Sequence, residues 1–250
     1  MALIPPRRIE ILGVPVDCVS MHAALDCVDE FVTRPGAATI FAINPEKVMK
    51  ARQDPWLLDQ MRGAALLIPD GIGVVWAARL LGRASLERVP GADLMSGICG
   101  RAAAKGYRIF LYGAAPETNA LARTALEQRF PGIAIVGNRH GYVTQAEMPA
   151  LVSEINASGA QILFVALGSP RQELWMAHHL PELTIKVCQG VGGTFDVIAG
   201  TVRRAPASWQ ATNLEWAYRL LMDPRRLPRQ TSLPRFAWRV LAARFSRGRR

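Results

Sequence analysis

The stretch Arg108-Ile-Phe-Leu-Tyr-Gly-Ala-Ala-Pro116 decides the fold class of this chain. Residues 108–112 form a short apolar run of the kind found in buried strands, and residues 116–130 have a helical pattern in which Pro116 suits the first turn. Another apolar run, residues 133–136, follows directly. A strand, a helix and a further strand in this order predict a parallel sheet covered by helices.

The same alternation extends over most of the chain. Residues 20–32 and 145–158 have helical patterns, and Ser20 is placed to cap the first of them. Further strand candidates are residues 9–12, 39–43, 65–68, 161–167 and 185–188. We therefore predict an α/β fold, a mostly parallel Rossmann-like sheet flanked by helices, as a catalytic domain over residues 1–200. Residues 201–250 are predicted to form a helical, Arg-rich C-terminal appendage.

The net charge of +10 belongs entirely to this appendage. Residues 1–200 hold 18 basic and 18 acidic residues, whereas residues 201–250 hold 12 arginines and only two acids, Glu215 and Asp223. Aromatic residues are interspersed among these arginines. Such a segment is expected to bind a phosphate-bearing surface, either nucleic acid or anionic lipid.

A helix over residues 236–247 would be suited to a membrane interface. Trp238, Leu241 and Phe245 would share one side, with arginines around them. Phe236 and Val240 fall among the arginines, so the amphipathic pattern is imperfect and a solvated basic tail is the alternative.

Several classes of protein are disfavoured. Pro69, Asp70 and Arg79 interrupt the apolar stretch 63–82, which predicts a strand, a turn and a helix rather than a membrane span. The N-terminus lacks the order of a signal peptide, so any membrane contact is expected to be peripheral. The cysteines and histidines lack metal-ligand spacing, and we expect buried thiols in a reducing cytoplasm, no metal site and no cofactor.

Polar residues and glycines gather where the predicted strands end. In a parallel sheet these ends share one edge, where ligands bind and helix N-termini can hold an anion. The dinucleotide fingerprint fails, because Trp76 and Phe195 stand where Gly71-Ile-Gly73 and Gly190-Val-Gly192 would need a third glycine. An NAD(P)-dependent oxidoreductase and a nucleic-acid-binding protein are kept as alternative functions.

Asp70 is the most suggestive single residue. It ends an apolar run and precedes two glycines that would let a ligand approach the backbone. Burial at such an edge can raise a carboxyl pKa into the range of a general base. The alternative is that Asp70 caps the helix that follows.

Six ordered motifs carry a family resemblance. They are Asn44-Pro-Glu46, Pro69-Asp-Gly-Ile-Gly-Val-Val-Trp76, Leu167-Gly-Ser-Pro-Arg-Gln-Glu173, Gly193-Thr-Phe-Asp196 through Arg204-Ala-Pro206, Leu214-Glu-Trp216 with Arg219-Leu220, and Pro224-Arg-Arg226. Over roughly residues 8–230 the chain resembles the WecG/TagA/CpsF family of bacterial glycosyltransferases. The resemblance implies an inverting transfer of a hexose or N-acetylhexosamine from a UDP-sugar to an undecaprenyl-diphosphate-linked saccharide. It also implies no essential metal, no nucleic acid as partner, and an appendage that meets the inner face of the plasma membrane.

The resemblance assigns roles to individual residues. Asp70 matches the proposed catalytic base, and Asn44 and Gln172 match polar residues beside it, for which helix capping is the alternative. Tyr142 and Asp196 are candidates for binding the uridine portion, with Gly193 also at the substrate. Arginines of the appendage are implied to approach the diphosphate, namely Arg219, Arg226 and Arg229. One departure is Ala42, where members often have Thr, and this leaves the identity of the sugar open.

Overall fold

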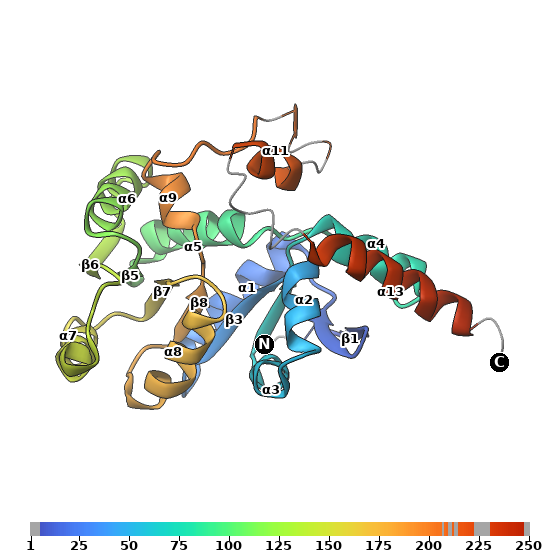
Figure 1. Cartoon of the computed structure of the whole chain (residues 1–250). Coiled ribbons are helices and arrows are strands. Elements are labelled where there is room, and N and C mark those ends of the chain that lie inside the picture. Colours follow the sequence, from blue (N-terminus) through green and yellow to red (C-terminus); the bar gives the residue numbers. More distant parts are fainter. Residues whose placement is uncertain (1–5, 207, 210–211, 213–214, 223–230, 248–250) are drawn as a thin grey trace.

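In the part of the chain that the computed structural model describes, six parallel strands form the central sheet in the order β4-β3-β8-β7-β5-β6 (Figure 1). The described residues are 6–206, 208–209, 212, 215–222 and 231–247. The strands are β3 (Ala38–Ile43), β4 (Leu66–Pro69), β5 (Arg108–Gly113), β6 (Ala134–Arg139), β7 (Ile162–Ala166) and β8 (Val187–Gly190). The predicted α/β fold with a parallel sheet is confirmed.

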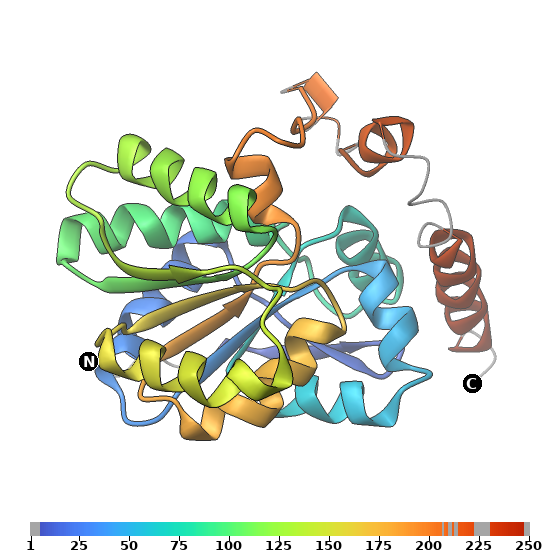
Figure 2. The same ribbon diagram turned by 60° about the vertical axis from the view of Figure 1, so that its left-hand side comes forward.

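Helices cover both faces of this sheet, as Figure 2 shows. Alternate residues of β5 enter opposite clusters: Ile109 and Leu111 pack on one face, Phe110 and Tyr112 on the other. The first face is covered by α1 (Met21–Thr33), α5 (Gly91–Lys105), α6 (Pro116–Arg129) and α9 (Thr194–Ile198). The second is covered by α2 (Pro45–Ala51), α3 (Pro55–Gly63), α4 (Ile72–Leu80), α7 (Met148–Ala157), α8 (Arg171–His179) and η2 (Leu180–Glu182). The exposed turn η1 (Gln145–Glu147) leads into α7.

The local signals at the helix ends act as predicted. The Ser20 side chain accepts a hydrogen bond of 3.2 Å from the Ala23 amide at the start of α1. Pro116 lies in the first turn of α6. The apolar stretch 63–82 is a strand and a helix, β4 and α4, joined by a turn. None of the described helices has the length and apolar run needed to cross a membrane.

The first strand does not belong to the parallel sheet. β1 (Arg8–Ile11) pairs antiparallel with β2 (Val14–Asp17) in a separate two-stranded sheet. Leu12 and Gly13 both have positive φ angles, 53° and 85°, as a tight two-residue hairpin turn requires. Asp17 ties this hairpin to the domain by accepting a 2.8 Å hydrogen bond from the Leu67 amide of β4. The sequence predicted one strand here, over residues 9–12, whereas the structure has two joined by a hairpin turn.

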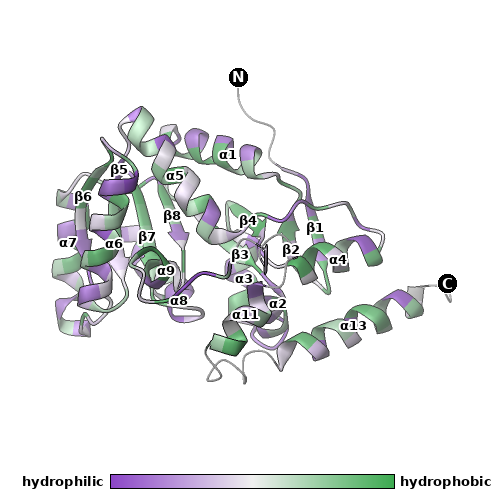
Figure 3. Cartoon of the chain, turned by 90° about the horizontal axis from the view of Figure 1, so that it is seen from above, coloured by the Kyte–Doolittle hydropathy of each residue, from purple (hydrophilic) through white to green (hydrophobic). Residues whose placement is uncertain are grey.

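The appendage is helical where it is described, in α11 (Glu215–Met222) and α13 (Ser232–Arg247). Helix α13 contacts α2 and α4 and carries hydrophobic and hydrophilic residues along its length (Figure 3). Phe236 and Val240 are the two apolar residues that fell among the arginines in the sequence pattern. Both are buried in the same cluster as residues of α2 and α4. The pattern is imperfect because α13 has two apolar faces, one packed on the body and one exposed. The division into domains at residue 200 stays a prediction.

Candidate active site

Four adjacent strands, β4, β3, β8 and β7, bring predicted site residues to one edge of the sheet. Asp70 follows β4, Asn44 follows β3, Gly193 follows β8, and Gln172 lies beyond β7 in the first turn of α8. Since all these strands run parallel, their carboxyl ends share this edge, which is where such sheets bind ligands. The sequence placed these residues at strand ends, and the strand order makes them neighbours.

Asn44 begins helix α2 and caps it. Its Oδ1 accepts a 2.8 Å hydrogen bond from the Lys47 amide, so the capping alternative is observed. The side-chain amide nitrogen of Asn44 has no hydrogen bond to the described residues, and the residue is half-buried. A capping oxygen fixes the side chain, which leaves its amide nitrogen as a fixed donor for a ligand at this edge.

Two glycines after Asp70 have a different role from the one expected. A Cβ on Gly71 would lie 2.7 Å from Pro45 Cδ, and one on Gly73 would lie 2.8 Å from Pro45 Cγ. The glycines therefore let helix α4 approach the start of α2, rather than letting a ligand approach the backbone. This contact holds Asp70 and Asn44 side by side, with the Asp70 amide donating to the Ile43 carbonyl at 3.0 Å.

Asp70 does not cap the helix that follows it. The N-cap of α4 is Gly71, with no side-chain hydrogen bond. Asp70 Oδ1 instead accepts a 3.3 Å hydrogen bond from the amide of Gly91, the first residue of α5. The Asp70 carbonyl accepts a 3.0 Å bond from Arg88 Nε. The carboxylate is thus oriented from a distant helix while the residue stays half-buried at the sheet edge.

Gln172 is buried and holds the neighbouring loop. Its Oε1 accepts a 3.0 Å hydrogen bond from the Gly192 amide, and its Nε2 donates to Glu173 Oε1 at 3.2 Å. A Cβ on Gly190 would lie 2.5 Å from Gln172 Nε2, so Gly190 makes room for this side chain. The expected alternative, capping of the helix, is not what Gln172 does; it fixes the loop that contains Gly193.

A buried ion pair was missed by the sequence reasoning. Lys47 Nζ lies 2.7 Å from Glu173 Oε1, and both side chains are almost completely buried. Burial favours the neutral form of Glu173, but the charge and hydrogen bond of Lys47 outweigh it, and the pKa of Glu173 lies below its usual value. One sequence feature could have indicated this pair. Lys47 and Glu173 each lie in the first turn of a helix that follows a buried strand, and their charges are opposite.

The other predicted substrate residues are divided between two places. Asp196 is half-buried in α9, and its Oδ2 lies 3.4 Å from where a Cβ of Gly193 would be. Tyr142 follows β6, and its side chain is 69% exposed. The loop that carries Tyr142 turns back over the ends of β5 and β7, because the Gly141 amide donates to the Ala114 carbonyl at 2.8 Å and a Cβ on Gly141 would lie 2.8 Å from Leu167 Cδ2. Among the described residues, no hydrogen bond or ring contact joins Tyr142 to Asp70, Asn44 or Gln172.

The described residues offer no obvious metal site. No group of three or more His, Cys, Asp or Glu residues among them is arranged to hold an ion. The four cysteines are free thiols; Cys27, Cys99 and Cys188 are buried and Cys18 is half-buried.

A sequence model described as the glycosyl transferase WecG/TagA/CpsF family matches residues 9–250. The chain belongs to this family. It is therefore a glycosyltransferase, which acts on a sugar donor and an acceptor. This membership disfavours the oxidoreductase and nucleic-acid-binding alternatives.

The appendage of this glycosyltransferase reaches the site edge through Glu215. The Glu215 carboxylate, buried on α11, lies 3.0 Å from Arg88 and 3.6 Å from Arg204. Since Arg88 also binds the Asp70 carbonyl, two interactions connect α11 to the candidate base. The sequence reasoning missed both residues, although Glu215 is one of only two acids in the last fifty residues.

These contacts do not test the diphosphate-binding role predicted for the arginines of the appendage. Arg219 belongs to α11, but its side chain is not among those that the structure describes. Arg226 and Arg229 lie outside the described residues.

Proposed function

We propose that this glycosyltransferase transfers a hexose or N-acetylhexosamine from a UDP-sugar to an undecaprenyl-diphosphate-linked saccharide. The reaction would serve the synthesis of a bacterial cell-surface polysaccharide of the exopolysaccharide, teichoic acid or common-antigen type. Family membership supports the transferase chemistry. The single observation that carries the proposed mechanism is the half-buried carboxylate of Asp70, oriented by Gly91 beside the fixed amide of Asn44.

In this mechanism Asp70 acts as the general base. It removes the proton of the acceptor hydroxyl as that oxygen attacks the anomeric carbon. The bond between this carbon and the UDP oxygen breaks in the same displacement, and UDP leaves with the electron pair. A single displacement on the face opposite to the leaving group inverts the anomeric configuration. Asn44 Nδ2 is proposed to hold a substrate hydroxyl near Asp70.

The donor is proposed to lie along the carboxyl edge from β4 toward β6. Gly193 and Asp196 would contact it in the middle of this edge, and Tyr142 would hold the uridine at the far end. Gln172 contributes indirectly, because its bond to the Gly192 amide fixes the loop. Helix N-termini and arginines, including those of the appendage, would stabilise the departing diphosphate without an essential metal.

We further propose that the enzyme is peripheral on the inner face of the plasma membrane. The exposed face of α13 supports this, because Trp238, Leu241 and Phe245 form a ridge opposite the buried Phe236 and Val240. Exposed arginines flank the ridge, namely Arg235, Arg239 and Arg244. Aromatic side chains between cationic flanks are typical of helices that lie in a membrane interface.

Helix α4 supports the same orientation. Trp76 and Leu80 are exposed, and they follow Gly73 at helical spacings of three and seven residues. Phe236 of α13 packs near Gly73, so this stripe borders α13. Residues outside the appendage would therefore add to the membrane-facing surface.

Thermal shift with UDP, NAD and single-stranded DNA tests the proposed donor class. Stabilisation by UDP alone is expected. A panel of UDP-sugars, assayed against a synthetic lipid-diphosphate sugar, would then identify the transferred sugar. Stabilisation by NAD or by DNA, with no response to UDP, would contradict the proposal.

A further inference from the structure

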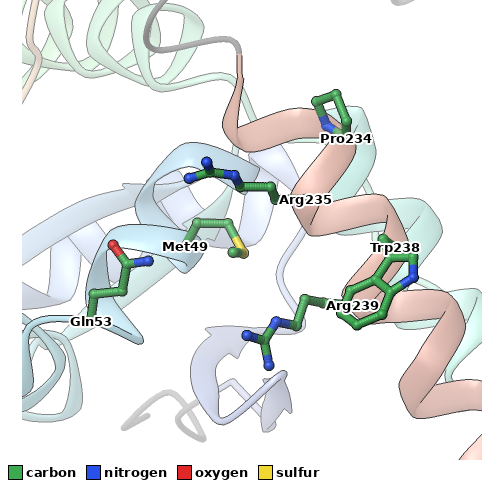
Figure 4. Close-up of a pocket in the computed structure, with 6 residues that line it drawn as sticks. All are labelled: Met49, Gln53, Pro234, Arg235, Trp238 and Arg239. Atoms are coloured by element: carbon green, nitrogen blue, oxygen red, sulfur yellow. The ribbon is translucent and has the colours of Figure 1, made fainter.

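Helices α2 and α13 enclose a groove on the flank of the exposed ridge. Its volume is about 470 Å³, and it is lined by Met49, Gln53, Pro234, Arg235, Trp238 and Arg239. Figure 4 shows Arg235 and Arg239 extending from α13 toward α2 across this space. The groove therefore combines two cations from the appendage with a wall supplied by the catalytic body.

The lining has the character of a site for an anionic amphiphile. Met49, Pro234 and Trp238 give it apolar walls, and none of the six lining residues is acidic. Arg235 and Arg239 are four residues apart on one helix, and neither forms an ion pair with a described residue. Like charges at this spacing repel each other, and a shared anion would relieve the repulsion. Arg239 also lies over the Trp238 ring, 5.9 Å from its centre.

We propose that this groove binds one anionic phospholipid. The phosphodiester would lie between Arg235 and Arg239, whose planar guanidinium groups donate paired hydrogen bonds to phosphate oxygens. The adjoining glycerol and acyl segment would contact Met49, Pro234 and Trp238. A free phosphate ion would leave these apolar walls uncontacted, which is why a lipid fits better.

The position of the groove supports a lipid as the occupant. Trp238 belongs both to the groove and to the ridge proposed to enter the membrane interface. When the ridge is inserted, its flanks lie at the depth of the headgroups. The inference rests on the proposed membrane association. It adds a specific lipid contact that would join α13 to α2, the helix capped by the candidate site residue Asn44.

A single charge in the turn that follows α2 provides a sharp test. Gln53→Glu places a carboxylate in the groove, whereas Gln128→Glu places the same charge at an exposed position on α6. Binding is measured by co-sedimentation with phosphatidylcholine vesicles, with and without phosphatidylglycerol. We expect Gln53→Glu to weaken binding to phosphatidylglycerol vesicles about tenfold, and Gln128→Glu to change it less than about twofold.

A charge-matched pair of double variants separates the groove from general attraction. Arg235→Gln with Arg239→Gln removes two charges from the groove, and Arg79→Gln with Arg244→Gln removes two exposed charges elsewhere. The groove variant should lose most of the preference for phosphatidylglycerol, and the control should lose much less. Circular dichroism and melting temperature check that each variant is folded. Equal losses in the two double variants, or wild-type binding by Gln53→Glu, would overturn the lipid site.

Competitors identify the source of the phosphate. Inorganic phosphate and glycerophosphoglycerol, the headgroup without its acyl chains, should displace the protein from vesicles only weakly. Full displacement by either would overturn the lipid assignment in favour of a free phosphate site. The wild-type protein could fail to bind phosphatidylglycerol vesicles and still transfer sugar to a short-chain soluble acceptor. That result would overturn the lipid site and the membrane association, but not the proposed reaction.

Discussion

Lys47 and Glu173 form a buried ion pair of 2.7 Å that joins the two helices at the centre of the site. Lys47 lies one turn beyond Asn44 on α2, and Glu173 directly follows Gln172 on α8. The pair therefore fixes the separation between two site residues that come from different strands. Glu173 Oε2 is buried and has no hydrogen-bond partner among the described residues, so the charge of this carboxylate is compensated at Oε1, by Lys47 and by the side-chain amide of Gln172.

Removing one partner of this pair should be costly. Glu173→Gln leaves the Lys47 ammonium buried without its counterion, and we expect the free energy of unfolding at pH 7 to fall by about 3–5 kcal/mol. Replacing both residues, as Lys47→Met with Glu173→Leu, should recover much of this loss. Urea unfolding measures both effects, and equal stability of Glu173→Gln and wild type would contradict the prediction.

The pair should also give a pH dependence of known sign. The pKa of Glu173 is lowered in the folded protein, so its contribution is fully present above the unfolded pKa, about 4.3. It is lost as the pH falls through the lower folded value. The wild type should therefore lose stability below about pH 4.3 more steeply than the variant lacking both charges. Parallel slopes in urea unfolding series across this range would argue against the shift.

Gly73 should be intolerant of a methyl group. Gly73→Ala places a Cβ 2.8 Å from Pro45 Cγ, and we expect a loss of about 1–3 kcal/mol because α4 must move away from α2. Gly63→Ala is the matched control, since nothing lies within 4 Å of its Cβ position at the end of α3. Thermal unfolding compares the two, and a similar melting temperature for both would show that the contact at Pro45 relaxes easily.

Asp70→Asn should abolish transfer while preserving the fold. The amide oxygen can still accept from Gly91, but the side chain can no longer take the acceptor proton. A lost general base costs about 10²–10⁴-fold in rate. Turnover is measured together with UDP binding and melting temperature, both of which should stay close to wild type. Activity within about threefold of wild type would assign Asp70 a structural role only.

The appendage arginines should divide into two functional groups. Arg226→Lys with Arg229→Lys should preserve vesicle binding but lower turnover at least about tenfold, because Lys does not reproduce the paired donors of a guanidinium on a diphosphate. Lys replacements at the end of the chain should leave both properties almost unchanged: Arg244, Arg247, Arg249 and Arg250.

A short-chain soluble acceptor is the decisive control for this division, because it removes any need for the membrane. If the Arg226 and Arg229 variant is fully active on that acceptor, the appendage serves only as an anchor.

Transfer should not require a divalent ion. The chain offers no Asp-x-Asp motif, and we expect helix N-termini and arginine to stabilise the leaving diphosphate. Turnover is measured in EDTA and after addition of Mg²⁺ or Mn²⁺. Activity that disappears in EDTA and returns with either ion would refute this mechanism.

The fold class and the sheet edge that holds the candidate site could both be predicted from local patterns in the sequence. Strands and helices follow from periodicities of two to four residues, and the caps at Ser20 and Asn44 act within three residues of themselves. Parallel strands end at a common edge, so the sequence alone assigns Asn44, Asp70 and Gly193 to one rim.

The pairing of residues across that rim depends on how the strands and helices are arranged in space. Lys47 and Glu173 are separated by 126 positions, and Arg88 and Glu215 by 127, so no local spacing could pair them. Local spacing also could not predict that Pro45 fills the space beside Gly73. Nor could it predict that Phe236, which does not fit the amphipathic pattern of its helix, is buried against the body of the protein. Local patterns depend on neighbours along the chain, whereas these contacts depend on strand order and helix packing, which place residues from distant parts of the chain next to one another.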